Sequence, residues 1–378
     1  MNVISKKIIQ SALISSLIML TGCKTTENTA SPIIDTKEHF LIGTYTKESS
    51  KGVYKVTLDP AAQSFTNDGV IATAENPSYL ALSKNQSTLF AATGSKSGSV
   101  DRLTWNNDLG QYSLAQQMKD LGQGTCHISL NPQETQIAIA NYGSGDVHLF
   151  NIDTKTQELS KSGYFKNSGK GPSWRQEKPH MHFVTWDNVG NFLYAVDLGT
   201  DEVKVFNSND KTFTPAVAAK LPAGDGPRHM IFHPKKPWAY VVNELSNTVA
   251  VFTQNEVTGK LTQIQHVDIA KGRGDKNISS AIKISNDGQY LYAAVRGINE
   301  IAVLKINDDG RVKFIQSHTT LGNWPRDITL SANQNHLLIA NQNSNTVTVL
   351  KRDVKTGLLT STDMKLDISI PSYIGVFK

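Results

Sequence analysis

The sequence is poor in cysteine, and the two that it has are Cys23 and Cys126. Because Cys23 lies in an N-terminal segment that we expect to be processed, a single thiol remains for the folded part and no intrachain disulfide can form there. The excess of one sign of charge is also small, since 38 basic and 33 acidic residues give a formal net charge of +5, and the sequence contains no basic run. This balance argues against a nucleic-acid groove and against a polybasic membrane patch.

Long hydrophobic runs are missing beyond the first 23 residues, where Lys6 and Lys7 precede a mostly apolar stretch from Ile8 to Leu20. That stretch is too short to span a bilayer as a mature helix and is typical of an export signal. It ends in Leu20-Thr21-Gly22-Cys23, which resembles a bacterial lipobox. We therefore expect a lipoprotein signal peptide over residues 1–22 and a lipid on the Cys23 thiol. An ordinary secretory signal, in which Cys23 is incidental, is the alternative.

Such a chain would be an exported bacterial lipoprotein, anchored to the cell envelope at the outer membrane or in the periplasm. The lipid anchor would be its only membrane contact. It would suffice, because several acyl chains give stable anchoring. The mostly polar residues 23–36 would be the lipidated tether. Residues 37–378 then form one globular domain, and the composition of the chain, with 39% apolar and 19% charged residues, is typical of a globular protein.

A seven-residue motif recurs along this domain and determines the expected fold. Each copy begins with proline or a small polar residue, continues as an alternating β run and ends in serine or a near equivalent. The copies are Pro77–Ser83, Thr125–Asn131, Pro179–Thr185, Pro227–His233, Ser279–Ser285, Pro325–Ser331 and Pro371–Phe377. Their first residues are 48, 54, 48, 52, 46 and 46 positions apart, so seven similar units account for the domain.

Each unit has the pattern of several short antiparallel strands. A buried four-residue run follows the motif after a turn, as in Leu193–Val196, and a third run follows in several units, as in Val249–Phe252. With a weaker fourth strand, each unit is a propeller blade. The chain begins, near Phe40, with what look like strands two and three of a blade that lacks its first strand.

These features predict an all-β fold, a seven-bladed β-propeller of four-stranded antiparallel blades. The C-terminal strand should pair with the N-terminal strands and close the ring, which removes the exposed sheet edges. A parallel β-helix or an open solenoid is the alternative, but the repeats of those folds are shorter.

The chemistry should lie at one mouth of the central channel, because the start of strand one and the end of strand two share an edge of an antiparallel blade. The second residue of the motif is polar or reactive in every unit: Ser78, Cys126, His180, Arg228, Ser280, Arg326 and Ser372. Strand two ends 16 residues after the motif start in five of six units, and its last residues are Thr93, Asn141, Asp197, Asn243, Val295 and Asn341. Glu244 and Arg296 come directly after two of these ends.

The predicted mouth thus contains the catalytic candidates His180, Arg228, Glu244 and Arg296, and the substrate-binding candidates His182, Arg326, Asn243 and Asp197. Guanidinium, imidazole and carboxylate groups around a ring suit a small anionic substrate. Polar strand ends such as Asn243 often only satisfy backbone groups, and Arg228 and Glu244 could simply pair with each other. No cofactor is expected, and no metal: two histidines two residues apart could bind zinc, but a third ligand is not evident.

Several of these segments resemble motifs of the seven-bladed β-propeller lactonase family. Gly226–His229 followed by Val242–Leu245 resembles its central signature, and the likeness runs from about residue 40 to 378. Further segments that look like family motifs are Gly43–Thr46, Asn141–Gly145, Pro179–His182 and Asp197–Asp201. The family includes bacterial 6-phosphogluconolactonases and is similar to fungal carboxymuconate cyclases. In the cyclases, catalysis is attributed to residues that match His180, Arg228 and Glu244, with a second arginine that we place at Arg296.

The resemblance implies a lactonase that hydrolyses a sugar lactone or a related cyclic ester. His180 or Glu244 would act as general base on water, while Arg228 and Arg296 would stabilise the oxyanion and hold a carboxylate or phosphate. The expected partner is a small anionic sugar lactone or sugar acid, with no nucleic acid, and the protein is expected to be a monomer. The alternatives are a non-catalytic ligand- or protein-binding propeller lipoprotein and a muconate-type cycloisomerase.

Cys126 stands where many family members also have a small residue, which indicates packing and not a nucleophile. Two features depart from the family pattern. Thr93-Gly94 stands where the family often has Asn-Glu. Export is the larger discrepancy, because 6-phosphogluconolactone is a cytoplasmic metabolite. The resemblance therefore transfers the chemistry more safely than the substrate.

Overall fold

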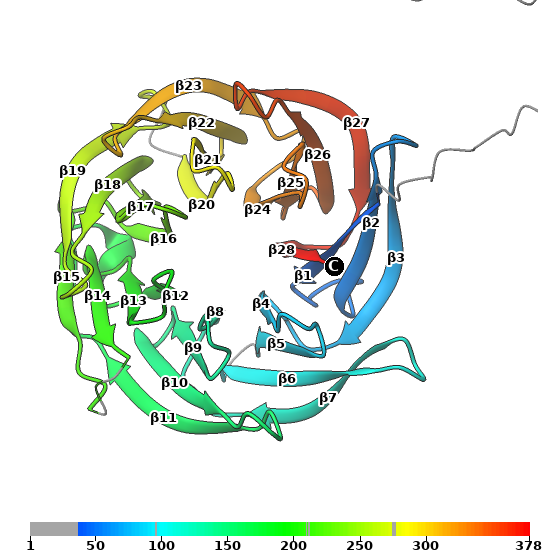
Figure 1. Cartoon of the computed structure of the whole chain (residues 1–378), viewed down its shortest axis with the longest axis horizontal. Helices are drawn as coiled ribbons and strands as arrows, with labels where there is room; N and C mark the ends of the chain where they lie inside the picture. The colour runs from blue at the N-terminus through cyan, green and yellow to red at the C-terminus, as the bar shows by residue number, and fades with distance from the viewer. Residues whose placement is uncertain (1–36, 95–96, 209, 211, 274–276) are drawn as a thin grey trace, which may run out of the picture. The chain divides into compact units, whose positions relative to one another are not determined.

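The computed structural model describes residues 37–94, 97–208, 210, 212–273 and 277–378. In these ranges the chain forms 28 strands, β1 to β28, and one short 3₁₀ helix, η1 (Trp174–Gln176). The strands make seven four-stranded sheets, which Figure 1 shows as blades around a ring. The prediction of an all-β, seven-bladed propeller is confirmed. The expected signal peptide, the tether and Cys23 lie outside the described residues.

Six blades take four consecutive strands, and the seventh combines the two ends of the domain. Within each sheet the pairs are antiparallel. The first three blades of consecutive strands, from the innermost strand outward, are β4 (Tyr79–Leu82), β5 (Thr88–Thr93), β6 (Ser99–Asn106) and β7 (Gln111–Met118); β8 (Thr125–Leu130), β9 (Gln136–Asn141), β10 (Asp146–Ile152) and β11 (Leu159–Lys166); and β12 (Met181–Trp186), β13 (Phe192–Asp197), β14 (Glu202–Asn207) and β15 (Ala216–Lys220).

The next three blades follow the same order. They are β16 (Pro227–Phe232), β17 (Trp238–Asn243), β18 (Thr248–Gln254) and β19 (Leu261–Asp268); β20 (Ile278–Ile284), β21 (Tyr290–Arg296), β22 (Glu300–Ile306) and β23 (Val312–Thr319); and β24 (Pro325–Leu330), β25 (His336–Asn341), β26 (Thr346–Arg352) and β27 (Leu359–Asp367). The closing blade consists of β28 (Pro371–Phe377), β1 (Glu38–Thr44), β2 (Gly52–Asp59) and β3 (Ser64–Thr73).

The ring is closed by antiparallel pairing of the C-terminal strand β28 with the N-terminal strand β1, with Ile42 opposite Ile374 and Phe40 opposite Val376 (Figure 1). Phe40, Ile42 and Ile374 are completely buried and pack with Leu338 of the preceding blade. Closure therefore joins the chain ends by hydrogen bonds and by a shared hydrophobic core. The predicted manner of closure is confirmed.

Burial follows the distance of a strand from the axis. All six residues of β13 are buried because both faces of this strand pack inside the ring, which accounts for the continuous apolar run in the sequence. The outermost strand β27 instead alternates, with one face toward solvent.

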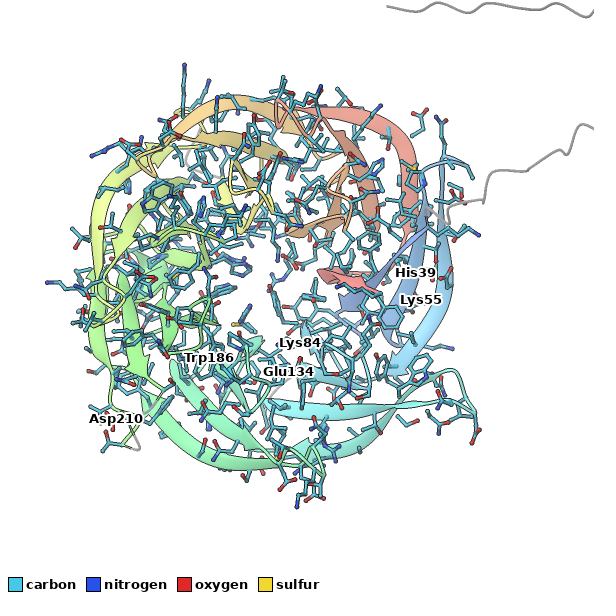
Figure 2. All side chains as sticks on the ribbon, in the orientation of Figure 1. His39, Lys55, Lys84, Glu134, Trp186 and Asp210 are labelled. Carbon is cyan, nitrogen blue, oxygen red and sulfur yellow. The ribbon has the colours of Figure 1, made fainter. Side chains whose placement is uncertain are left out.

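Polar contacts also join neighbouring blades: the main-chain N–H of Lys84 donates to the Glu134 carboxylate at 2.7 Å, and both residues are labelled in Figure 2. Across the described ranges, no helix is long and apolar enough to span a membrane.

Candidate active site

β-Bulges occur at the start of six of the seven inner strands. The register of β16 against β17 skips Arg228, and similar shifts skip Cys126, His182, Arg326 and Ser372, and Ser280 together with Ala281. A bulge re-aims the side chain of its extra residue, and bulges are frequent beside active sites. The repeated bulge therefore takes a side chain out of the ladder at the start of six inner strands.

A cavity of about 390 Å³ lies where these strand starts meet the ends of the second strands. It is lined by Tyr45, Lys47, Asn76, Ser78, Gly94, Gly124, Thr125, Cys126, Tyr142, Arg175, His182, Glu244, Arg296 and Arg326. The charged groups and the histidine come mainly from one side of the ring, between β11 and β27. The other side contributes hydroxyl, amide and thiol groups and glycine backbone, with Lys47 as its one charge. The cavity therefore has a cationic half and a polar half that is uncharged apart from Lys47, which we call the neutral half.

Glu244 is the centre of the cationic half. Its Oε2 forms ion pairs with Arg228 Nε at 2.8 Å and with the Arg296 guanidinium at 3.0 Å, and its Oε1 accepts a hydrogen bond from Arg175 at 2.8 Å. Burial alone would raise the pKa of Glu244, but Arg296 and Arg228 lower it well below the usual range. Glu244 is therefore a carboxylate held by three guanidinium groups, and this cluster keeps a net positive charge.

The arginines differ in their access to the cavity. Arg228 is only 2% exposed, does not line the cavity and donates to the Ser280 carbonyl at 2.6 Å, so it lies behind Glu244. Arg296 lines the cavity while donating to the carbonyls of Ile278 and Ser279. Both arginines were predicted to lie at the mouth, and of the two only Arg296 lines the cavity. Arg228 instead fixes the position of the Glu244 carboxylate.

His182, and not His180, is the imidazole of the cavity. His182 Nε2 lies 3.9 Å from Glu244 Oε2, whereas His180 is stacked on Tyr142, bonds to its carbonyl and contacts Glu177. The prediction that His180 acts directly at the mouth is not supported by this geometry. Burial, with a further contribution from Arg228, lowers the pKa of His182 well below its ordinary value, so its imidazole is neutral at neutral pH.

The exchange of the two histidines has a simple cause in the register. Met181 pairs with Asp197 as Pro227 pairs with Asn243, so His182 and not His180 is the counterpart of Arg228. The motif copy in this blade is therefore displaced by two residues. The sequence contained a signal of this, because Asp197 follows Pro179 by 18 positions where the other units have 16.

Arg326 lines the cavity, as predicted, and donates to the Tyr45 hydroxyl at 2.7 Å. Asn243 and Asp197 do not line it. Asn243 donates to Asp225 and Thr248, and Asp197 accepts from Asn167 and from the His180 and Gly199 main-chain N–H groups. Direct substrate binding by these two side chains is therefore not supported. They hold the turns behind the mouth, which is the structural alternative considered for such strand ends.

Sequence reasoning missed Arg175 and the two tyrosines Tyr45 and Tyr142, which line the cavity. Arg175 belongs to η1, in the segment between two blades, where no repeat marks it. Cys126 lines the cavity: its thiol bonds to the Met181 and His182 main-chain carbonyls, and burial raises its pKa to about 11. Within the described ranges, no three His, Cys, Asp or Glu side chains gather in a way that could hold a metal ion.

A closed seven-bladed propeller with a cationic cavity and a buried carboxylate–imidazole pair at one mouth defines an enzyme of the propeller lactonase class. The sequence model of the family described as "Lactonase, 7-bladed beta-propeller" matches residues 39–376. The chain belongs to this family, and it is a lactonase.

Relatives and solved structures agree with this assignment. The chain is 33% identical over 333 residues to the 6-phosphogluconolactonase of Bacillus subtilis, covering 87% of this chain and 95% of that protein. A putative 6-phosphogluconolactonase from Bacteroides fragilis superposes with a TM-score of 0.83 at 29% identity, covering 91% and 99% of the two chains. A periplasmic gluconolactonase from Pseudomonas aeruginosa gives the same TM-score and coverage at 28% identity.

Proposed function

We propose that the protein hydrolyses a sugar lactone of the 6-phosphogluconolactone or gluconolactone type in this cavity. The observation that carries the proposal is the neutral His182 imidazole 3.9 Å from the ionised Glu244 carboxylate, in a wall that also presents Arg296, Arg175 and Arg326. The cavity volume of about 390 Å³ is within the range of small-molecule sites. The names of the relatives in Bacillus and Pseudomonas support the same substrate class.

The two halves of the cavity favour a sugar over a hydrocarbon diacid. The neutral half offers the Tyr45, Ser78 and Thr125 hydroxyls and the Asn76 amide, which match the hydroxyl groups of a sugar ring. Gly94 keeps a side chain out of this half: its φ is +96°, and a Cβ would come within 2.3 Å of the Ser97 carbonyl oxygen. A muconate-type diacid has no hydroxyl groups that could bond to these oxygens, so hydrolysis of a sugar lactone is preferred over cycloisomerisation.

Ring opening needs one water molecule and one base. In the proposed mechanism, the water oxygen bonds to the lactone carbonyl carbon while His182 takes a proton from the water. Arg296 donates to the carbonyl oxygen as it becomes an oxyanion, with Arg175 and Arg326 adding positive charge nearby. The tetrahedral intermediate then expels the ring oxygen, which receives the proton from the imidazolium. Glu244 stabilises that imidazolium and keeps the arginines in place.

The two histidines give the direct test of this assignment. Glutamine at His182 is expected to lower kcat by roughly 100-fold or more, since it removes the general base. Glutamine at His180, a neighbour of similar burial that does not line the cavity, should change kcat by less than about 10-fold. Opening of δ-gluconolactone and of its 6-phosphate is followed by pH-stat and corrected for spontaneous hydrolysis.

The same assay can contradict the proposal. A variant H182Q that turns over both lactones as the wild type does would remove His182 from the mechanism. Wild-type protein that opens neither lactone but binds gluconate would favour the non-catalytic propeller.

Export as a lipoprotein is part of the proposal and rests on the lipobox-like Leu20–Cys23 and on the periplasmic location in the name of the Pseudomonas structure. A substrate outside the cytoplasm would then be a sugar lactone formed by oxidation of a sugar in the envelope. The variant C23S should remain in the aqueous phase after detergent phase partitioning of expressing cells, while wild-type protein enters the detergent phase. Wild-type protein that stays in the aqueous phase would exclude the lipid anchor.

A further inference from the structure

The segment that carries Arg175 is fixed to the propeller. Ser173 and Gln176 form a capping box around η1, and the buried Gln176 amide donates to the Leu198 carbonyl at 2.8 Å and to Asp201 at 2.7 Å. The main chain under Arg175 is therefore held firmly, and movement at this point would be a movement of the side chain.

Arg175 differs from the other two guanidinium groups that contact Glu244. Its side chain is 25% exposed, compared with 2% for Arg228 and 5% for Arg296. The other two also donate to main-chain carbonyls, whereas the guanidinium of Arg175 donates to two cavity side chains, Glu244 at 2.8 Å and the Tyr142 hydroxyl at 3.2 Å. Arg175 can therefore turn toward a ligand without giving up a main-chain hydrogen bond.

The two oxygens of Glu244 are used differently. Oε2 faces Arg228, Arg296 and His182, while Oε1 has its ionic contact with Arg175. If Arg175 leaves, one carboxylate oxygen becomes available in the cavity and the other stays fixed. The carboxylate is thus arranged so that a single side chain covers one of its oxygens.

We propose that Arg175 is a positioning residue that the substrate displaces. Its guanidinium covers Glu244 Oε1 in the free protein and moves to an anionic group of the substrate on binding. The uncovered Oε1 then accepts a hydrogen bond from the attacking water and orients it toward the lactone carbonyl, while His182 takes the other proton. This step rests on the proposed lactonase mechanism and makes its rate depend on the charge of the substrate. The substrate class is a lactone that also carries a phosphate or a carboxylate.

Kinetics with three lactones test this role: neutral δ-gluconolactone, its 6-phosphate, and a glucaric acid lactone that carries a carboxylate. For R175Q, kcat/KM for the anionic lactones is expected to fall about 10- to 100-fold, the range for loss of a charge-assisted hydrogen bond. For the neutral lactone, kcat/KM should stay within about 3-fold or rise, because Oε1 is uncovered permanently. R175K should recover part of the preference for anionic lactones. The comparison of the two anionic lactones shows whether phosphate or carboxylate is the preferred group.

The control is R311Q, which removes the same charge from an exposed side chain on the β22–β23 turn, paired with Asp309. It should leave all three rates unchanged. Equal losses on neutral and anionic lactones in R175Q, or no loss on any, would overturn the proposal. If the wild type opens no lactone, the proposed function fails, but the role of Arg175 can still be tested by calorimetric binding of gluconate and 6-phosphogluconate to the wild type and to R175Q. Loss of the preference for 6-phosphogluconate in R175Q would support the role of Arg175. A preference that R175Q retains would overturn it.

Discussion

Replacing Glu244 by glutamine is expected to remove most lactone hydrolysis and, at the same time, to lower the free energy of unfolding by about 3–5 kcal/mol, the usual cost of breaking a buried ion pair. Arg228 and Arg296 are almost completely buried, and both form ion pairs with Glu244 Oε2. Glutamine keeps the shape but leaves these cations without their counter-charge. Turnover of δ-gluconolactone 6-phosphate should fall about 100-fold or more, because His182 and the arginines lose their common partner. Urea unfolding and initial rates on the same preparations measure both effects.

Two variants separate charge from structure in this experiment. E177Q removes a carboxylate from the same rim, but Glu177 is 57% exposed, so stability and rate should remain near wild type. The double variant E244Q/R228M removes a positive charge together with the negative one and should recover part of the stability but none of the activity. A single variant E244Q with wild-type stability would show that Glu244 does not neutralise the buried arginines.

The fold could be predicted from the sequence because each repeat shows the apolar pattern of its buried strands. The buried run Leu193–Val196 is apolar without alternation because both faces of β13 are covered. Ring closure could be recognised because Phe40 begins a run that lacks a first strand and Ile374 belongs to a strand that lacks partners. The outer strands were less evident, because a strand such as β27 has one face in solvent and its pattern is interrupted by a register shift.

The site could be predicted only where a residue keeps its place in the repeat. Glu244 and Arg296 stand at the ends of second strands and Arg326 at the start of a first strand, and the structure brings them to one cavity. His180 was chosen over His182 because the motif was aligned on Pro179, although the 18-residue spacing from Pro179 to Asp197 marks this copy as displaced by two residues.

Other site features depend on the three-dimensional contacts. Asn243 stands at the end of its strand as predicted, but Asp225 and Thr248 accept its side-chain hydrogen bonds and keep it out of the cavity. Arg175 reaches Glu244 across 69 positions of sequence from a segment outside the repeat. Neither of these contacts has a spacing that a sequence pattern could reveal.

Acidification from pH 7 to pH 5 is expected to destabilise the protein steeply because of three buried histidines near the axis. His229 Nε2 accepts from the Arg228 guanidinium at 3.0 Å, and His127 Nδ1 accepts from the Val184 N–H, so neither nitrogen can take up a proton without losing its bond. Burial lowers the pKa of His127, His182 and His229 well below the ordinary value of about 6.5. The three rings lie close together, with ring centres 5.6 Å apart for His182 and His229 and 5.8 Å apart for His127 and His229.

The sign of the effect follows from proton binding. Below about pH 6.5 the unfolded chain protonates these histidines while the folded protein does not, so the free energy of unfolding falls as the pH falls, until the low folded pKa values are reached. Each histidine contributes at most about 1.4 kcal/mol per pH unit, and the three together contribute up to about 4 kcal/mol per pH unit. Urea unfolding at half-unit intervals between pH 7 and pH 5 measures this slope.

The histidine contribution can be isolated by substitution, since the buried carboxyls Asp197 and Asp327, whose pKa values are raised by burial, act in the opposite sense. His127→Gln can still accept from Val184 and should reduce the slope by about one third of the histidine contribution. A slope that is the same in the wild type and in H127Q would mean that the folded protein protonates this ring as readily as the unfolded chain does. In that case the interior around the axis would be accessible to water, and the low pKa that makes His182 a neutral base would lose its physical cause.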